Sequence, residues 1–396
     1  MKTIGTVLST ILLIFIFSCD SEGPESLADL SDSGAAASSF SEGASSGSSG
    51  GTGQGGGQSG LITAGEWNDL DNWDFWKNLV NNQGYEDKPA MWSFYTNNRI
   101  SVLVTDQSAA PIADVKVAIK ENGVVVWAAK TDNLGKAELW IGLNEKKAAI
   151  EIANYSLFVN NEVVPGSVKL NDNGTNVIIL TSTQAPTSRV ELSFIVDATG
   201  SMADELEFLK DDLQDVIQKV EGTNPNLNIL TSTVFYRDEG DDYVVKHSAF
   251  TDNISTTSNY INQQSASGGG DFPEAVHTAL KTAINELQWS EVARTRIALL
   301  LLDAPPHENQ QIIDDLQHSI KLAAEKGIKI IPITASGIGK ETEFLMRFFA
   351  IATNGTYVFI TNDSGIGNDH LEPSIGEYEV EYLNNLLVRL INKYTE

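Results

Sequence analysis

Short apolar runs alternate with amphipathic stretches from about residue 189 to the C-terminus. The apolar runs have the unbroken hydrophobicity of strands buried in a parallel sheet, and they lie at 190–196, 228–236, 244–250, 295–302, 328–334 and 356–360. The stretches between them place apolar residues three and four positions apart, as on one face of a helix, at 203–220, 274–289, 314–326, 341–352 and 375–394. This alternation predicts βα units and a six-stranded, doubly wound (Rossmann-like) α/β domain over 186–396.

Shorter runs between residues 99 and 183 predict a separate all-β domain. Apolar residues alternate at 100–104, 115–119 and 137–141, and two continuous runs lie at 123–129 and 177–180. A small β-sandwich of about 80–120 residues accounts for this spacing. The segments VTDQSAAPIADVKVAI and KTDNLGKAEL resemble Ig-like and carboxypeptidase-regulatory-like modules. We expect such a domain over 61–185, as a spacer or a binding module.

A stripe of large apolar side chains precedes these runs at a spacing of three residues. Its members are Trp67, Leu70, Trp73, Trp76 and Leu79. This spacing fits one face of a short helix, and such stripes usually belong to a core. A platform that stacks on carbohydrate is the alternative.

The first 60 residues have the pattern of an export signal followed by a linker. A short apolar run after one positive charge predicts a signal peptide over 1–18. The tetrapeptide IFSC resembles a bacterial lipoprotein box, in which Cys19 is lipidated, although its Phe17 is bulkier than usual. The Ser- and Gly-rich remainder predicts a disordered tether over 19–60. We therefore expect a lipid-anchored protein of the bacterial cell envelope, at the outer membrane, on its periplasmic or surface face.

The chain is strongly acidic. Its net charge is −27, from 26 basic and 53 acidic residues. This charge repels phosphate backbones, so we expect no nucleic acid partner. The single cysteine lies in the N-terminal segment, which excludes a disulfide within the chain.

Polar residues follow the first long apolar run of the α/β domain. Asp197, Thr199 and Ser201 are two positions apart, and Gly200 allows a tight turn in which their oxygens converge. One carboxylate and two hydroxyls suit a small hard cation such as Mg²⁺ better than zinc. The structural alternatives are a simple turn at Gly200 and a helix cap at Ser201.

Two further carboxylates follow predicted strands or precede a predicted helix. Asp303 ends the run LLLLD, and Asp271 follows three glycines in GGGDFPEAV. In an open α/β sheet the loops at the carboxyl ends of the strands form the ligand crevice, so both residues can meet Asp197 there.

Charged residues near these loops also have simpler interpretations. Asp271 with Glu274 three positions later fits a capping box at the start of the next helix. Arg237 and Asp238 follow the 228–236 run, and a charged pair in such a turn is more often solvated than functional. We therefore leave them out of the predicted ligand set.

The motifs DATGS, GGGD and LLLLD occur in this order and resemble those of the von Willebrand factor type A (vWA) fold, over residues 188–396. The resemblance implies a metal-ion-dependent adhesion site (MIDAS) that binds one Mg²⁺ (or Mn²⁺ or Ca²⁺) and a protein or glycan ligand. Its implied metal ligands are Asp197, Thr199, Ser201, Asp271 and Asp303. Many adhesion members have Thr where this chain has Asp271, and the extra carboxylate favours a water-bridged Asp271 or a neutral or basic group on the ligand.

The sequence contains no catalytic motif that we recognise. His307-Glu308 lacks the second histidine of a zinc helix, because Gln311 stands in that position. Residues 337–340 lack the first glycine and the hydroxyl residue of a phosphate loop, and there is no G-x-S-x-G turn outside the Ser- and Gly-rich segment 19–60. We therefore expect a binding protein and no enzyme, with a metal-dependent hydrolase or an envelope assembly factor as the alternatives.

Overall fold

The computed structural model describes residues 59–82, 84–146, 149–181 and 187–396, which belong to one compact unit. The predicted signal peptide over 1–18, the lipidation site Cys19 and all but the last residues of the predicted tether lie outside the described residues. The predicted domain boundary at 185–186 is also outside them. In the described part of the chain, no helix is both long enough and apolar enough to cross a membrane.

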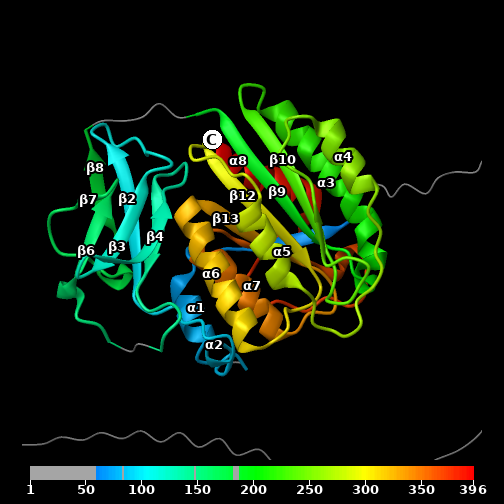
Figure 1. The fold of residues 1–396 in the computed structure, drawn as a ribbon, viewed down its shortest axis with the longest axis horizontal. Helices are drawn as coiled ribbons and strands as arrows, with labels where there is room; N and C mark the ends of the chain where they lie inside the picture. The colour runs from blue at the N-terminus through cyan, green and yellow to red at the C-terminus, as the bar shows by residue number, and fades with distance from the viewer. Residues whose placement is uncertain (1–58, 83, 147–148, 182–186) are drawn as a thin grey trace, which may run out of the picture. The chain divides into compact units, whose positions relative to one another are not determined.

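An eight-stranded mixed sheet has the order β11-β10-β9-β12-β13-β14-β1-β15. Figure 1 labels its strands β10, β9, β12 and β13. The parallel strands are β9 (Arg189–Asp197), β10 (Asn228–Tyr236), β12 (Thr295–Leu302), β13 (Ile328–Thr334) and β14 (Tyr357–Ile360). The antiparallel strands are β11 (Val245–His247), β1 (Thr63–Trp67) and β15 (Glu381–Tyr382). The parallel strands are buried along almost their whole length, which explains their unbroken apolar sequences.

Helices cover both faces of this sheet, as predicted for a doubly wound fold (Figure 1). One face packs against α3 (Ala203–Thr223), α4 (Ile254–Asn262) and α8 (Leu383–Thr395). The other face packs against α5 (Val276–Lys281), the π-helical turn Thr282–Glu286, α6 (Gln310–Lys326) and α7 (Lys340–Ala352). The carboxyl ends of the parallel strands therefore open on one edge between two helical layers.

The sheet differs from the prediction at its far edge. All six predicted strands are present, but β1 and β15 add two more. β1 lies within 61–185, which we expected to form the β domain, yet Ala64 pairs with Ile360 of β14. The predicted helix over 375–394 begins only at Leu383, because Gly376 and the acidic residues around it lack helical apolar spacing and residues 381–382 form β15.

Residues 99–180 form two small sheets from the predicted β-runs. The first has the order β5 (Lys136–Trp140), β2 (Arg99–Asp106), β8 (Asn176–Leu180). The second has the order β4 (Val124–Lys130), β3 (Lys116–Glu121), β6 (Tyr155–Val159), β7 (Glu162–Val163). Each predicted apolar run lies mainly in one of these strands, and the inward side chains are buried.

The aromatic stripe belongs to the core, as predicted, although only part of it is helical. α1 (Trp73–Leu79) contains Trp76, which is fully buried and stacks on Phe344 of α7 with ring centroids 5.6 Å apart. The short α2 (Lys88–Met91) follows. A buried ion-pair network fastens this segment to α7, since Arg347 lies 2.6 Å from Asp69 and 3.0 Å from Glu343.

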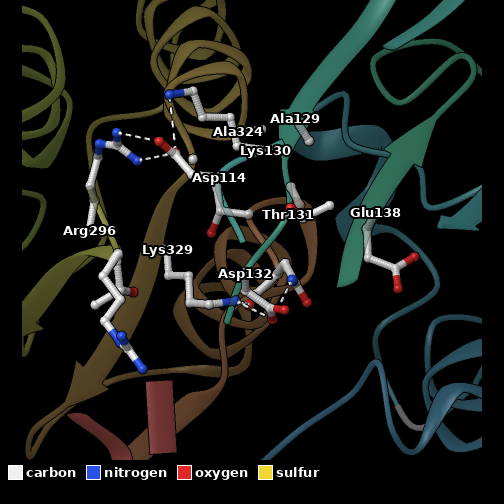
Figure 2. Close-up of a pocket in the computed structure, with 15 residues that line it drawn as sticks. Asp114, Ala129, Lys130, Thr131, Asp132, Glu138, Arg296, Ala324 and Lys329 are labelled. Carbon is white, nitrogen blue, oxygen red and sulfur yellow. Dashed lines mark hydrogen bonds and ion pairs between the residues drawn. The ribbon is translucent and has the colours of Figure 1, made fainter. Parts of the chain in front are cut away.

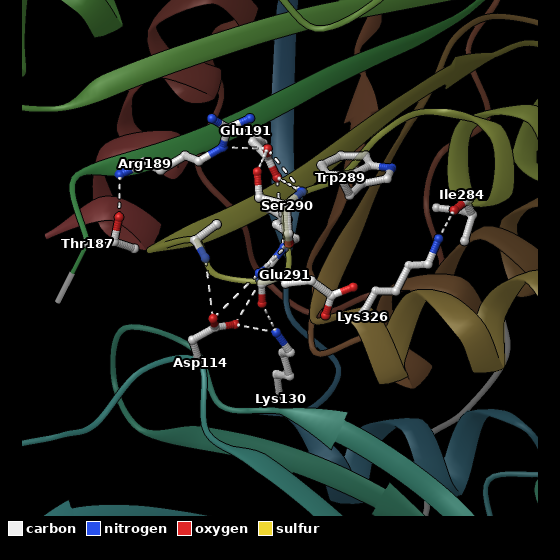
Figure 3. A network of polar contacts seen from close by, with 12 residues as sticks. Asp114, Lys130, Thr187, Arg189, Glu191, Ile284, Trp289, Ser290, Glu291 and Lys326 are labelled. Carbon is white, nitrogen blue, oxygen red and sulfur yellow. Dashed lines mark hydrogen bonds and ion pairs between the residues drawn. The ribbon is translucent and has the colours of Figure 1, made fainter. Parts of the chain in front are cut away.

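Charged side chains join the small sheets to the amino ends of the large-sheet strands. Asp114 accepts from Arg296 of β12 at 2.8 Å and lies 3.1 Å from Lys130 (Figure 2). Asp132 pairs with Lys329 of β13 at 3.1 Å. Nearby, the buried Glu191 of β9 accepts from Arg189 and Ser290 (Figure 3). This attachment lies at the edge opposite the carboxyl ends, which leaves the predicted site edge uncovered by the small sheets.

Candidate metal centre

The turn after β9 gathers oxygen atoms as the sequence predicts. Asp197 is fully buried, and its Oδ1 accepts hydrogen bonds from the N–H of Thr199 at 2.9 Å and from its hydroxyl at 2.7 Å. The Thr199 Oγ1 lies 3.1 Å from the Oγ of the exposed Ser201. Ser201 does not cap the next helix, because α3 begins at Ala203 with Met202 in the N-cap position and no side-chain cap, so that alternative is wrong.

Asp303 completes the pair of buried carboxylates at this edge. It directly follows β12, the neighbour of β9, and is 4% exposed. Burial, and then the charge of Asp303, raises the pKa of Asp197 to about 7, although the hydrogen bonds from Thr199 lower it. Burial likewise raises the pKa of Asp303 to about 6, against a hydrogen bond from Ser201. In the described part of the chain, no Lys or Arg forms an ion pair with either carboxylate, so the charge of these buried anions is not balanced.

Glu274 is a third carboxylate of the site, and the sequence analysis missed it. It is 3% exposed, and its N–H donates to Pro305 O at 2.9 Å, beside the loop of Asp303. A Cβ added to Gly269 would lie 2.7 Å from Glu274 Oε1 and 3.2 Å from Thr199 Cβ, so both side chains border the same small space. The only sequence signal for Glu274 was its place three residues after Asp271, which suggested capping.

Each of these carboxylates has one oxygen without a hydrogen-bond partner. In the described part of the chain, Asp197 Oδ2, Asp303 Oδ1 and Glu274 Oε2 are buried and accept no hydrogen bond. Burial, and then repulsion from Asp197 and Asp238, raises the pKa of Glu274 to about 9. Buried, unpaired carboxylate oxygens are rare unless they bind a proton or an ion, and oxygen-only sets suit hard divalent cations. The residues therefore fit the metal that the sequence implies.

Asp271 lies in a neighbouring group of side chains, with Asp238 and His307, and does not cap a helix. It is exposed, and one oxygen of it, one oxygen of Asp238 and a ring nitrogen of His307 all lie within 4.8 Å of one another. α5 begins at Val276 with Ala275 as N-cap and no side-chain cap bond, so the capping alternative for Asp271 is wrong.

The charged pair after β10 is not solvated, which corrects our expectation. Arg237 is 7% exposed and donates to Ala198 O at 3.2 Å and to Ser265 O at 2.9 Å. Asp238 is 4% exposed and lies 2.9 Å from His307 Nε2. The sequence analysis left Asp238 out because it assigned the residue to a solvated turn, and it tested His307 only as part of a zinc helix.

We compared the chain with protein-family models, with known sequences and with solved structures. A model of the von Willebrand factor A domain matches residues 191–362. A putative ariadne-like RING finger protein of Acanthamoeba polyphaga mimivirus is 37% identical over 131 residues, which are 33% of this chain and only 12% of that protein. Two solved structures are similar at low identity. One is the conserved hypothetical protein BatB from Bacteroides thetaiotaomicron, with 16% identity and a TM-score of 0.37; the match covers 52% of this chain and 98% of that one. The other is an aerotolerance-related membrane protein from Bacteroides fragilis, with 15% identity and a TM-score of 0.34; the match covers 52% of this chain and 99% of that one.

The family match and the geometry agree on the same part of the chain. The matched residues include most of β9 and all of β10, β12, β13 and β14. They also include Asp197 at the end of β9 and the loops that contain Glu274 and Asp303. Residues 191–362 therefore form a von Willebrand factor A domain.

Proposed function

We propose that the vWA domain binds one divalent cation, Mg²⁺ with Mn²⁺ or Ca²⁺ as substitutes, and uses it to hold a protein or glycan ligand. The observation that supports this most is the set of buried oxygens of Asp197, Asp303 and Glu274 that have no hydrogen-bond partner. The proposed ligands of the ion are Asp197, Thr199, Ser201, Asp303 and Glu274. Asp271, which lies with Asp238 and His307, acts beside this set and not within it.

The arrangement suits binding at a surface. Asp197 and Thr199 are fully buried, whereas Ser201 is exposed. The buried residues would hold the ion on its protein side, and a ligand would bind it from the solvent side, next to Ser201. A bound ion supplies a position that accepts an oxygen of the ligand. Phe272, which is 50% exposed in the loop beside Asp271, offers an apolar contact at the same edge.

We favour interaction over catalysis, with a metal-dependent hydrolase or an envelope assembly factor as the alternatives. In the described part of the chain, the hydroxyl partners of Thr199 are Asp197 and Ser201, and no histidine contacts either hydroxyl. A nucleophilic hydroxyl needs a free neighbouring base. The carboxylate that accepts from Thr199 is Asp197, which we propose as a ligand of the ion, so the two hydroxyls are better suited to ligation.

The rest of the chain fits display of this domain from a membrane. The N-terminal pattern up to Cys19 supports lipid anchoring at the outer membrane, on the periplasmic or the surface face, and 19–60 would be the tether. The two small sheets would form an Ig-like sandwich that serves as a spacer. The charge of −27 supports a partner other than nucleic acid.

Calorimetry on the soluble chain from residue 59 onwards tests the proposal. Mg²⁺ should bind the wild type and the control variant Asp252→Ala, which changes an exposed loop residue, but not Asp197→Ala. Equal Mg²⁺ binding by Asp197→Ala, or none by the wild type, would refute the metal site. Mg²⁺-dependent hydrolysis of chromogenic phosphate or ester substrates that is lost in Asp197→Ala would favour the hydrolase instead.

A further inference from the structure

A second group of metal-ligating side chains lies beside the proposed ion site. Asp238 follows β10, Asp271 lies in the loop before α5, and His307 lies in the loop after β12. Each offers one ligand atom, and these atoms all lie within 4.8 Å of one another, with Asp238 Oδ1 2.9 Å from His307 Nε2. Three loops that are distant in the sequence therefore bring an imidazole and two carboxylates together.

The backbone around this group is held in place by its own contacts. Asp241 Oδ2 accepts from the N–H of Asp238 at 3.1 Å and from the N–H of Gly269 at 2.9 Å. Gly268 has φ +82°, and a Cβ there would lie 2.3 Å from Asp241 Oδ2. A side chain at position 268 would thus clash with the carboxylate that joins the two loops.

The backbone at Glu274 contacts two of the three loops of this group. The N–H of Glu274 donates to Pro305 O at 2.9 Å, and the N–H of Ala275 donates to Arg237 O at 3.3 Å. Residue 274 therefore lies between the backbone next to Asp238 and the backbone next to His307. Glu274 is 3% exposed and its Oε2 has no hydrogen-bond partner.

The negative charge of this group is not balanced by a basic side chain. Within the described ranges, no Lys or Arg forms an ion pair with Asp238, Asp271 or Glu274. Arg237 is adjacent in sequence, but its guanidinium donates to the carbonyls of Ala198 and Ser265. A cation at this position would provide the missing charge.

We propose that Asp238, Asp271 and His307 form a second cation site, distinct in chemistry from the first, for a divalent ion that accepts an imidazole ligand, such as Zn²⁺ or Mn²⁺. Imidazole nitrogen binds Zn²⁺ and other transition metals, whereas Mg²⁺ and Ca²⁺ select oxygen. Asp271 is exposed, so positions of the ion that face solvent would bind water or a partner. This site goes beyond the proposed function, because none of its three residues is a proposed ligand of the first ion.

A Zn²⁺ titration of the full-length chain tests the proposal. Competition with a chromophoric chelator, in the presence of excess Mg²⁺, should show one Zn²⁺ bound per wild-type chain. His307→Ala and Asp271→Asn should weaken this binding at least about tenfold, since even removing an outer partner of a metal ligand has effects of that size. His318→Ala is the matched control, because His318 is exposed on α6, and its Zn²⁺ affinity should equal that of the wild type.

Two further measurements separate the outcomes. Asp197→Ala should lose Mg²⁺ binding and keep Zn²⁺ binding, so failure of the first site and failure of the second are distinguishable. Circular dichroism checks that His307→Ala is folded, and Asp271→Asn, at an exposed position, provides the test if it is not. No Zn²⁺ bound by the wild type, or unchanged affinity in both variants, would show that Asp238 and His307 form only a hydrogen-bonded pair.

Discussion

Replacing Asp197 by Asn should make the metal-free protein more stable at neutral and alkaline pH. The Asn side chain keeps the shape of Asp, and its oxygen accepts the same two hydrogen bonds from Thr199. It removes a negative charge that is fully buried next to Asp303. The substitution therefore removes a proposed metal ligand and should stabilise the protein in the absence of metal.

The raised pKa gives the size and the pH window of this effect. Burial, and then the charge of Asp303, raises the pKa of Asp197 from 3.8 to about 7. Between about pH 4 and pH 7, Asp197 keeps its proton in the folded protein and loses it in the unfolded chain. The contribution of Asp197 to the free energy of unfolding therefore falls as the pH rises from about 4 to about 7, and it is constant below and above this range. The difference corresponds to about 4 kcal/mol in the free energy of unfolding, or roughly 10 °C in Tm. Because Asp303 titrates together with Asp197, the two carboxyls share this penalty.

Thermal unfolding in EDTA, followed by circular dichroism, measures the effect. At about pH 8 the variant should unfold at a higher temperature than the wild type, and at about pH 5 the gap should shrink. At the higher pH, Mg²⁺ at one hundred times its Kd should raise the free energy of unfolding of the wild type by about 2.7 kcal/mol, and with it the Tm. Mg²⁺ should leave the variant unchanged. The control Asp252→Asn changes an exposed carboxylate and should match the wild type throughout.

Two results would refute this reasoning. One is a metal-free variant that is no more stable than the wild type at about pH 8, which would mean that Asp197 is not a buried, unpaired charge. The other is an equal gain in Tm from Mg²⁺ in both proteins, which would place the ion elsewhere.

Three further changes have defined outcomes. Gly269→Ala should weaken Mg²⁺ binding about tenfold or more, because the added Cβ would lie 2.7 Å from Glu274 Oε1. Gly222→Ala is the control, because position 222 has open space around it. Equal Mg²⁺ affinities of the two variants by calorimetry would contradict the role of Glu274. Arg347→Met should lower the free energy of unfolding by about 3–5 kcal/mol in urea titrations, because it leaves two buried carboxylates unpaired; a loss within measurement error would contradict it. Cys19→Ser should move the protein from the membrane fraction to the soluble fraction, and mass spectrometry that finds unmodified Cys19 in the mature wild type would exclude lipidation.

The parts of the site that the sequence predicted are local or depend only on strand order. Asp197, Thr199 and Ser201 lie within one turn, so their convergence follows from the spacing around Gly200. Asp303 ends the strand that neighbours β9, and the carboxyl ends of adjacent parallel strands meet at one edge. Such geometry can be inferred without knowledge of distant contacts.

The missed residues depend on contacts between segments far apart in the sequence. Glu274 is buried because its backbone pairs with Pro305, and its own sequence context resembles a helix start. Asp238 and His307 are 69 positions apart, and only the fold brings them to 2.9 Å. β1 was missed for the same reason, since TAGEW has no apolar alternation and becomes a strand only by pairing with β14 and β15.

A crystal structure of the protein with Mn²⁺, with an anomalous difference map at the manganese edge, tests the central claim most directly. The account predicts a manganese peak bound by Asp197, Asp303 and Glu274, at the oxygens that now have no hydrogen-bond partner. A map with no peak between these three carboxylates, in crystals that contain Mn²⁺ in excess, would contradict it.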